Sequence, residues 1–117
     1  MEGGRSGLTF REYQEKARRT QNPNLTPRER LEHALWGLAA EVGEVLGLHQ
    51  KTYQGHAMDA VALRKEIGDC LWMLGELCDV YGFDMGYIAE QNIEKLRKRY
   101  PAGFSTENSL HRSEGDV

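Results

Sequence analysis

Residues 31–48 read LEHALWGLAAEVGEVLGL, and their apolar side chains recur at steps of three and four. This spacing places the apolar side chains on one face of an α-helix. Just before this stretch, Thr26 is a good helix cap, Pro27 suits the first helical position and Glu29 completes a capping box. The sequence therefore predicts a helix that begins at Pro27 and runs to about residue 51.

Three further segments, residues 10–17, 60–81 and 85–100, show helical periodicity as well. The first follows Thr9 and the last follows Asp84, which can cap a helix, and the last two segments end at a glycine or just before a proline, which stop helices. No segment has the alternation of a strand. We therefore expect an all-α fold, a bundle of four to five helices.

Length and composition limit what this chain can be. Its 117 residues suffice for one domain, which we expect over residues 8–104, between a flexible N-terminus (1–7) and a mobile polar tail (105–117). The net charge of −3 argues against a nucleic-acid partner. The chain shows no apolar run that would span a membrane and no signal peptide. Its two cysteines are expected to lie in the core as free thiols. These features predict a cytoplasmic protein.

Two similar acidic strings lie in different predicted helices: Glu41-Val-Gly-Glu44 and Glu66-Ile-Gly-Asp69. Carboxylates three residues apart lie on the same side of a helix, and both pairs hold the same position relative to their apolar stripes. If the stripes pack as antiparallel neighbours, all four carboxylates converge, which is costly without a positive charge. Because no histidine or cysteine has the spacing of a soft-metal site, the expected ligand is Mg²⁺, or Mn²⁺ in its place.

Other acidic pairs and the helical glycines need separate interpretation. A single pair such as Glu76 and Asp79 is usually solvated, and we expect a largely solvated face here, with Glu76 nearer the site. Gly43 and Gly68 each cost about 1 kcal/mol of helix stability relative to alanine. They predict that another element approaches closely at both positions.

With their surroundings, these strings resemble the MazG-like, all-α NTP pyrophosphatase superfamily. The resemblance covers residues 8–104 and rests on three segments in the family's order and spacing. These are GLAAEVGEV (37–45), EIGDCLWML (66–74) and NIEKLRKRYP (92–101). The ordered set is far more specific than any one segment.

The resemblance implies a Mg²⁺ site formed by Glu41, Glu44, Glu66 and Asp69. It further implies that a metal-activated water cleaves the α–β phosphate linkage and releases pyrophosphate. Family members assemble as homodimers or dimers of dimers, often with active sites completed across subunits. A homodimer or homotetramer is therefore expected here.

One departure from the family pattern affects the catalytic base. Many members carry a further glutamate directly before the first motif glutamate, where this chain has Ala40. The resemblance thus leaves the base open between Glu41, Glu44 and a hydroxide held only by the metal.

Contacts to phosphate and sugar are expected from the last long helix, where Asn92, Lys95 and Arg99 share a face and Tyr100 follows. From spacing alone, basic residues here equally suit a solvated helix C-terminus. The resemblance favours substrate contact for Asn92 and Lys95, and less directly for Arg99.

Three ring side chains, His33, Trp36 and Trp72, are candidates for contact with the base. On a helical wheel His33 falls close to Glu44, and both tryptophans lie beyond the carboxylates. An aromatic ring there can stack on a base, an interaction worth about 1–3 kcal/mol. The alternative is that the tryptophans pack in the core or at a subunit interface.

The leading hypothesis is an enzyme that acts on a nucleoside triphosphate, a deoxynucleotide or non-canonical nucleotide, in nucleotide-pool housekeeping. Within the same fold, the alternatives are a dCTP- or dUTP-specific pyrophosphatase and a phosphoribosyl-ATP pyrophosphohydrolase. From another class, a non-catalytic helical assembly module could keep the metal for structure. A di-iron protein would need Glu-x-x-His pairs, and none occurs.

Overall fold

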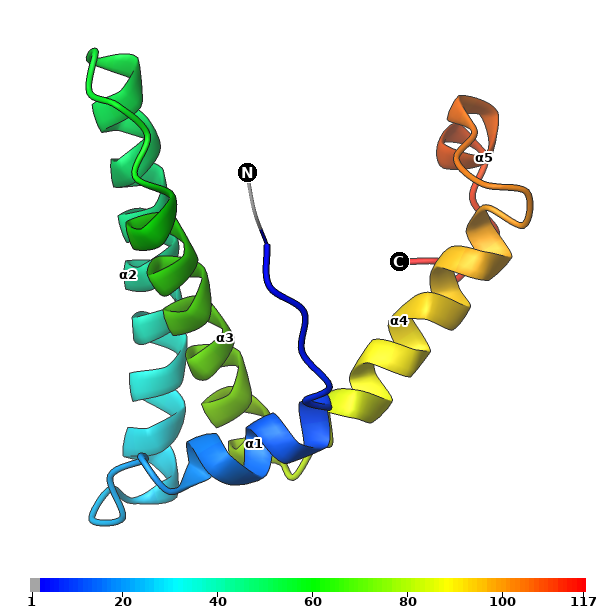
Figure 1. Cartoon of the computed structure of the whole chain (residues 1–117). Coiled ribbons are helices and arrows are strands. Elements are labelled where there is room, and N and C mark those ends of the chain that lie inside the picture. Colours follow the sequence, from blue (N-terminus) through cyan, green and yellow to red (C-terminus); the bar gives the residue numbers. More distant parts are fainter. Residues whose placement is uncertain (1–2) are drawn as a thin grey trace.

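The computed structural model describes residues 3–117, which form five α-helices and no strand (Figure 1). The all-α prediction is confirmed, and the four long helices begin and end within two residues of the predicted bounds. Residues 1–2 of the expected flexible N-terminus lie outside the described residues. The helices are α1 (Phe10–Arg18), α2 (Pro27–Tyr53), α3 (Ala60–Tyr81), α4 (Met85–Arg99) and α5 (Thr106–Leu110).

The helix ends follow the local sequence. At the start of α2, the Thr26 side chain accepts a hydrogen bond from the Glu29 amide, and the Glu29 carboxylate accepts one from the Thr26 amide. This reciprocal arrangement satisfies amides that the first helical turn leaves free. At the C-terminal end of α3, Gly82 stops the helix in a left-handed conformation (φ 69°) that favours glycine.

The α2–α3 hairpin is the part of the fold that positions the site, and the two helices lie side by side in opposite directions (Figure 1). A Cβ atom at Gly37 would lie 2.5 Å from the sulfur of Met73, so glycine permits the close approach there. At Gly43 and Gly68, by contrast, no atom of another described element lies within 4 Å of such a Cβ. The expected close approach at these two glycines is therefore wrong for the protomer, because both face away from its other helices.

Helix α1 is joined to the end of α3 by a buried polar cluster. The Asp79 carboxylate accepts hydrogen bonds from Gln14 (2.8 Å), Arg18 (2.8 Å) and Gln21 (2.6 Å). Gln14, itself buried, also accepts a hydrogen bond from the Met85 amide at the start of α4. The expectation of a solvated Asp79 is therefore wrong: its side chain is only 7% exposed, because α1 covers it.

Replacing Asp79 with alanine is expected to destabilise the protein by about 1–3 kcal/mol, because the buried Gln14 amide and the Arg18 guanidinium lose a charged acceptor. Burial raises the pKa of Asp79, but hydrogen bonds from Arg18, Gln14 and Gln21 outweigh it and hold the pKa below its usual value. The stability that ionised Asp79 contributes is fully present above the ordinary aspartate pKa and is lost as the pH falls through the lowered pKa. Urea unfolding at neutral and acidic pH measures both effects. An unchanged midpoint for Asp79→Ala, with Glu15→Ala as an exposed control, would contradict this role.

Apolar side chains are poorly covered in the protomer. Among residues 3–117, the buried hydrophobic side chains are Ala34 and Met85, whereas Leu46 is 64% and Ile67 54% exposed. One protomer therefore does not close a core around the two apolar stripes. The reason is visible in Figure 1: α4 contacts α1 and then diverges from the α2–α3 hairpin, so α4 does not cover the hairpin. The radius of gyration, 17.4 Å, exceeds the roughly 13 Å of a compact domain of about 100 residues.

The C-terminal segment folds back along α4. It contains α5, in the region expected to be a mobile polar tail, and then a turn that brings Asp116 to Arg99. The two side chains form a bidentate ion pair, with N–O distances of 2.9 and 2.6 Å. No helix in the described part of the chain is long and apolar enough to cross a membrane.

Candidate metal centre

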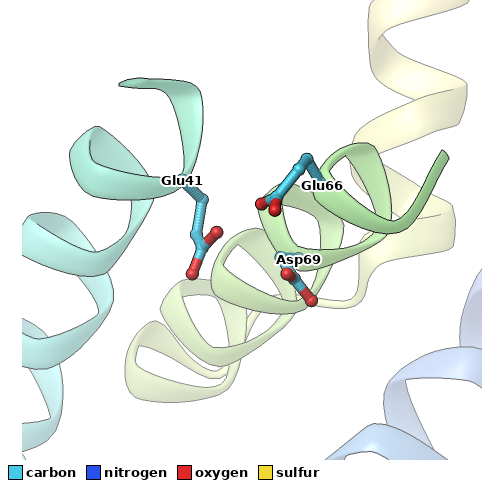
Figure 2. Close-up of side chains that lie close together, drawn as sticks. All are labelled: Glu41, Glu66 and Asp69. Atoms are coloured by element: carbon cyan, nitrogen blue, oxygen red, sulfur yellow. The ribbon is translucent and has the colours of Figure 1, made fainter. Parts of the chain in front are cut away.

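Three carboxylates converge between the two helices of the hairpin. Glu41 comes from α2, and Glu66 and Asp69 come from α3 (Figure 2). Each contributes one oxygen to a group in which all three oxygens lie within 4.8 Å of one another. Glu41 and Glu66 are half-buried and Asp69 is exposed. A group of this size and chemistry is suited to a hard divalent cation that keeps open positions for water or phosphate.

Helix geometry explains why these residues meet. Glu66 and Asp69 are three residues apart on α3 and therefore lie on one side of it. Glu41 lies one turn along α2 from Gly37, where Met73 of α3 packs closely against α2. The close approach thus brings the carboxylates of both helices together.

Glu44, the fourth predicted ligand, is not part of the three-carboxylate group. It is exposed on α2 one turn beyond Glu41. It nevertheless lies near enough for its charge to act on Glu41. The structure therefore brings together three of the four acidic motif residues and leaves the fourth at the edge of the cluster.

The pKa of Glu41 is raised above its usual value. Partial desolvation is the largest cause, followed by the charge of Asp69 and by the hydrogen bond and charge of Glu66. Carboxylates held this close repel one another unless a proton or a cation lies among them. The donor set therefore fits a divalent cation, which would remove the repulsion that the fold creates.

We expect Glu41→Gln to make the metal-free protein more stable to heat at neutral pH. A carboxylate whose pKa is raised by folding binds protons better in the folded state, so its destabilising effect grows as the pH rises through this window. The amide removes that repulsion. Thermal unfolding with a chelator tests the prediction, with Glu15→Gln on α1 as the exposed control. Added Mg²⁺ should raise the unfolding temperature of the wild type but not of Glu41→Gln; a less stable metal-free variant would contradict the account.

The predicted phosphate and sugar contacts lie apart from the carboxylates within one protomer. Asn92 and Lys95 are exposed on α4, which diverges from the hairpin (Figure 1). The Arg99 guanidinium is paired with Asp116, and Tyr100 packs against the ring of Phe104. The protomer by itself therefore does not assemble these four side chains around the cluster. Sequence spacing could place them on one helix face but could not fix the direction of that helix.

The predicted base contacts lie near the end of the hairpin that α1 covers. Trp72 packs edge-on against His33, with ring centroids 6.1 Å apart, and its indole N–H donates to the Thr20 hydroxyl over 2.7 Å. Trp36 is 70% exposed. The three rings are therefore neither in the core nor gathered into one closed pocket.

The side chain of Glu76, like that of Asp79, is far more buried than the sequence predicted. It was expected on a largely solvated face, but it is only 1% exposed, because it points into the interface between α2 and α3. Its carboxylate lies 2.5 Å from the Nδ1 atom of His33. One signal was available: Glu76 lies seven residues, or about two turns, beyond Asp69 and so on the same face of α3.

The fold and the cluster together define an all-α protein with an oxygen-ligand site of the kind that holds a divalent cation. Residues 29–104 match the family model of the MazG nucleotide pyrophosphohydrolase domain, and the chain belongs to this family. The resemblance inferred from the motifs is thereby confirmed. The matched region contains the three clustered carboxylates and all of α4. No curated protein and no solved structure matches the chain.

Proposed function

We propose that this protein is a Mg²⁺-dependent nucleoside triphosphate pyrophosphohydrolase that yields a nucleoside monophosphate and pyrophosphate. The observation that carries the proposal is the convergence of Glu41, Glu66 and Asp69 inside the region that matches the family model. The substrate is a ribo- or deoxynucleoside triphosphate, with a deoxynucleotide or non-canonical nucleotide favoured, and the role is housekeeping of the cytoplasmic nucleotide pool.

In this proposal the clustered carboxylates hold the cation, with Glu44 beside them and Mn²⁺ able to replace Mg²⁺. A bound Mg²⁺ would neutralise phosphate charge and acidify a water molecule. Glu44 and Glu41 are the two candidate bases. Glu44 is exposed and outside the group, which leaves its carboxylate available to accept a proton from the attacking water. Attack at the α-phosphorus breaks its bond to the bridging oxygen, and pyrophosphate leaves.

The proposal assigns phosphate and sugar binding to Asn92, Lys95, Arg99 and Tyr100 on α4 and base contact to His33, Trp36 and Trp72. Because α4 diverges from the carboxylates in one protomer, the α4 residues would reach a cluster on a partner. The uncovered apolar faces support the same conclusion. We therefore propose a homodimer or homotetramer as the functional unit, in which Arg99 exchanges Asp116 for substrate.

Turnover of a nucleotide panel tests this function. The purified protein would be incubated with each common NTP and dNTP, including dCTP and dUTP, and with phosphoribosyl-ATP, with and without Mg²⁺. Release of pyrophosphate that needs Mg²⁺, persists in Glu15→Gln and is lost in Glu66→Gln would support the proposal. The relative rates would show which nucleobase the protein prefers. No turnover of any of these compounds, or of modified nucleotides, would contradict it and leave a non-catalytic metal-binding module.

A further inference from the structure

We propose that Glu76 is a positioning residue that holds the His33 imidazole so that its Nε2 atom accepts a hydrogen bond from an N–H of the substrate's base. The inference rests on the proposed function and deepens it, because it names a determinant of nucleoside recognition that lies outside the metal motif.

The first observation is the burial of Glu76. Its side chain is the largest of the fully buried side chains among residues 3–117. One oxygen, Oε1, contacts Nδ1 of His33, and the other, Oε2, is buried without a hydrogen-bond partner in the described protomer. A buried carboxylate with an unpaired oxygen is expensive, and an apolar residue of similar size is often at least as stabilising at such a position. Stability alone therefore does not explain Glu76.

The second observation is the orientation of His33. Its side chain is 48% exposed although its Nδ1 edge faces the interior. A carboxylate only accepts hydrogen bonds, so the Nδ1 atom carries the proton, and in the neutral ring Nε2 becomes an acceptor. Nε2 makes no hydrogen bond within residues 3–117. The buried contact thus fixes both the tautomer and the direction of an unused acceptor.

A third side chain restrains the same ring. Trp72 meets the His33 imidazole edge-on, at an interplanar angle of 87°. The indole N–H is itself held by the hydroxyl of Thr20 in the segment after α1. The imidazole is therefore fixed by groups from α3 and, through Trp72, from the connection between α1 and α2. Such fixed orientation is what a recognition group needs, since little further ordering is required on binding.

The position of this group along the hairpin suits a nucleoside. His33 lies eight residues before Glu41 on α2, and Glu76 lies seven residues after Asp69 on α3. At 1.5 Å per residue, the two separations are about 10–12 Å along the helix axes. A nucleotide with its α-phosphate at the carboxylates would span this distance with its sugar and base. All four common bases offer an N–H on their pairing edge, so the contact orients the nucleoside whichever base is preferred.

The test compares two substitutions at Glu76 in the full chain. Glu76→Leu removes the contact and fills the space, so the free energy of unfolding should stay the same or rise while KM for the best nucleotide rises about tenfold and kcat changes less than threefold. Glu76→Gln keeps an oxygen that can accept from Nδ1 and should retain a KM within about threefold of the wild type. Equal KM values in all three proteins with normal kcat would overturn this inference while leaving the proposed function intact.

A second readout needs no turnover. Long-range proton–nitrogen NMR of the histidine rings, with His33 assigned from His33→Gln, reports the tautomer directly. The wild type should show the Nδ1-protonated form, and its Nε2 resonance should shift when a nucleoside monophosphate is added but not when pyrophosphate alone is added. Loss of the fixed tautomer in Glu76→Leu would support the positioning role. An Nε2 resonance that stays unchanged at saturating nucleotide, or that shifts equally with pyrophosphate, would overturn it.

Discussion

Replacing Asp69 with asparagine is expected to lower kcat/KM for the best nucleoside triphosphate by about 10²–10³-fold, the usual scale when one group that stabilises developing charge is removed. Asp69 is one of three carboxylates whose oxygens converge between α2 and α3. Asparagine has the same shape but carries no charge, so the cluster would lose affinity for the cation. Steady-state pyrophosphate release at several Mg²⁺ concentrations measures the effect.

Stability separates a loss of function from a loss of fold in this experiment. Asp69 is exposed and the cluster is self-repelling, so the variant should unfold at the same temperature as the metal-free wild type or higher. The control Glu15→Gln removes an exposed charge from α1 and should keep full activity. Full activity in Asp69→Asn would show that the cluster does not carry the chemistry.

Replacing Leu46 with glutamate is expected to dissociate the proposed homo-oligomer to monomers at micromolar concentration. Leu46 is 64% exposed on α2 in the protomer. If the protomer were complete by itself, an exposed change of this kind would alter stability by no more than about 0.5 kcal/mol. If a partner covers the α2 face, an unpaired charge there costs several kcal/mol, enough to weaken association by a factor of about 100 or more. Sedimentation velocity distinguishes the two cases.

A polar position on the same helix provides the control. Lys51 points about 140° away from Leu46 around α2, so Lys51→Glu places the same side chain on a different face, with a larger change in net charge. This variant should sediment like the wild type. A wild-type protein that is monomeric at micromolar concentration, or a Leu46→Glu variant that remains fully assembled, would contradict the proposed partner contact.

The helices were predictable from sequence because their ends depend on local chemistry. Thr26 and Glu29 form their capping box within one turn, and Gly82 stops α3 through its own backbone conformation. The pairing of Glu41 with Glu66 and Asp69 was also predictable, since helical spacing and antiparallel packing determine it. These features depend on few contacts between distant parts of the chain.

The remaining features depend on tertiary arrangement, which spacing does not encode. The burial of Asp79 follows from α1 lying across it, and the burial of Glu76 follows from the exact rotation of α3 against α2. The helix that carries Lys95, α4, diverges from the α2–α3 hairpin that carries the carboxylates, although the motif order placed them in one expected site. In each case the local pattern predicted the helix correctly, but the neighbour that covers or leaves that part of the helix is known only from the structure.

The most direct test of the central claim is phosphorus NMR of one reaction: the protein, Mg²⁺ and the nucleoside triphosphate that it turns over fastest. The account predicts that nucleoside monophosphate and pyrophosphate signals grow in equal amounts, and that neither grows with Glu66→Gln or without the metal. Nucleoside diphosphate and orthophosphate in their place would show that a different bond is cleaved and would contradict the assignment of this site as a pyrophosphohydrolase centre.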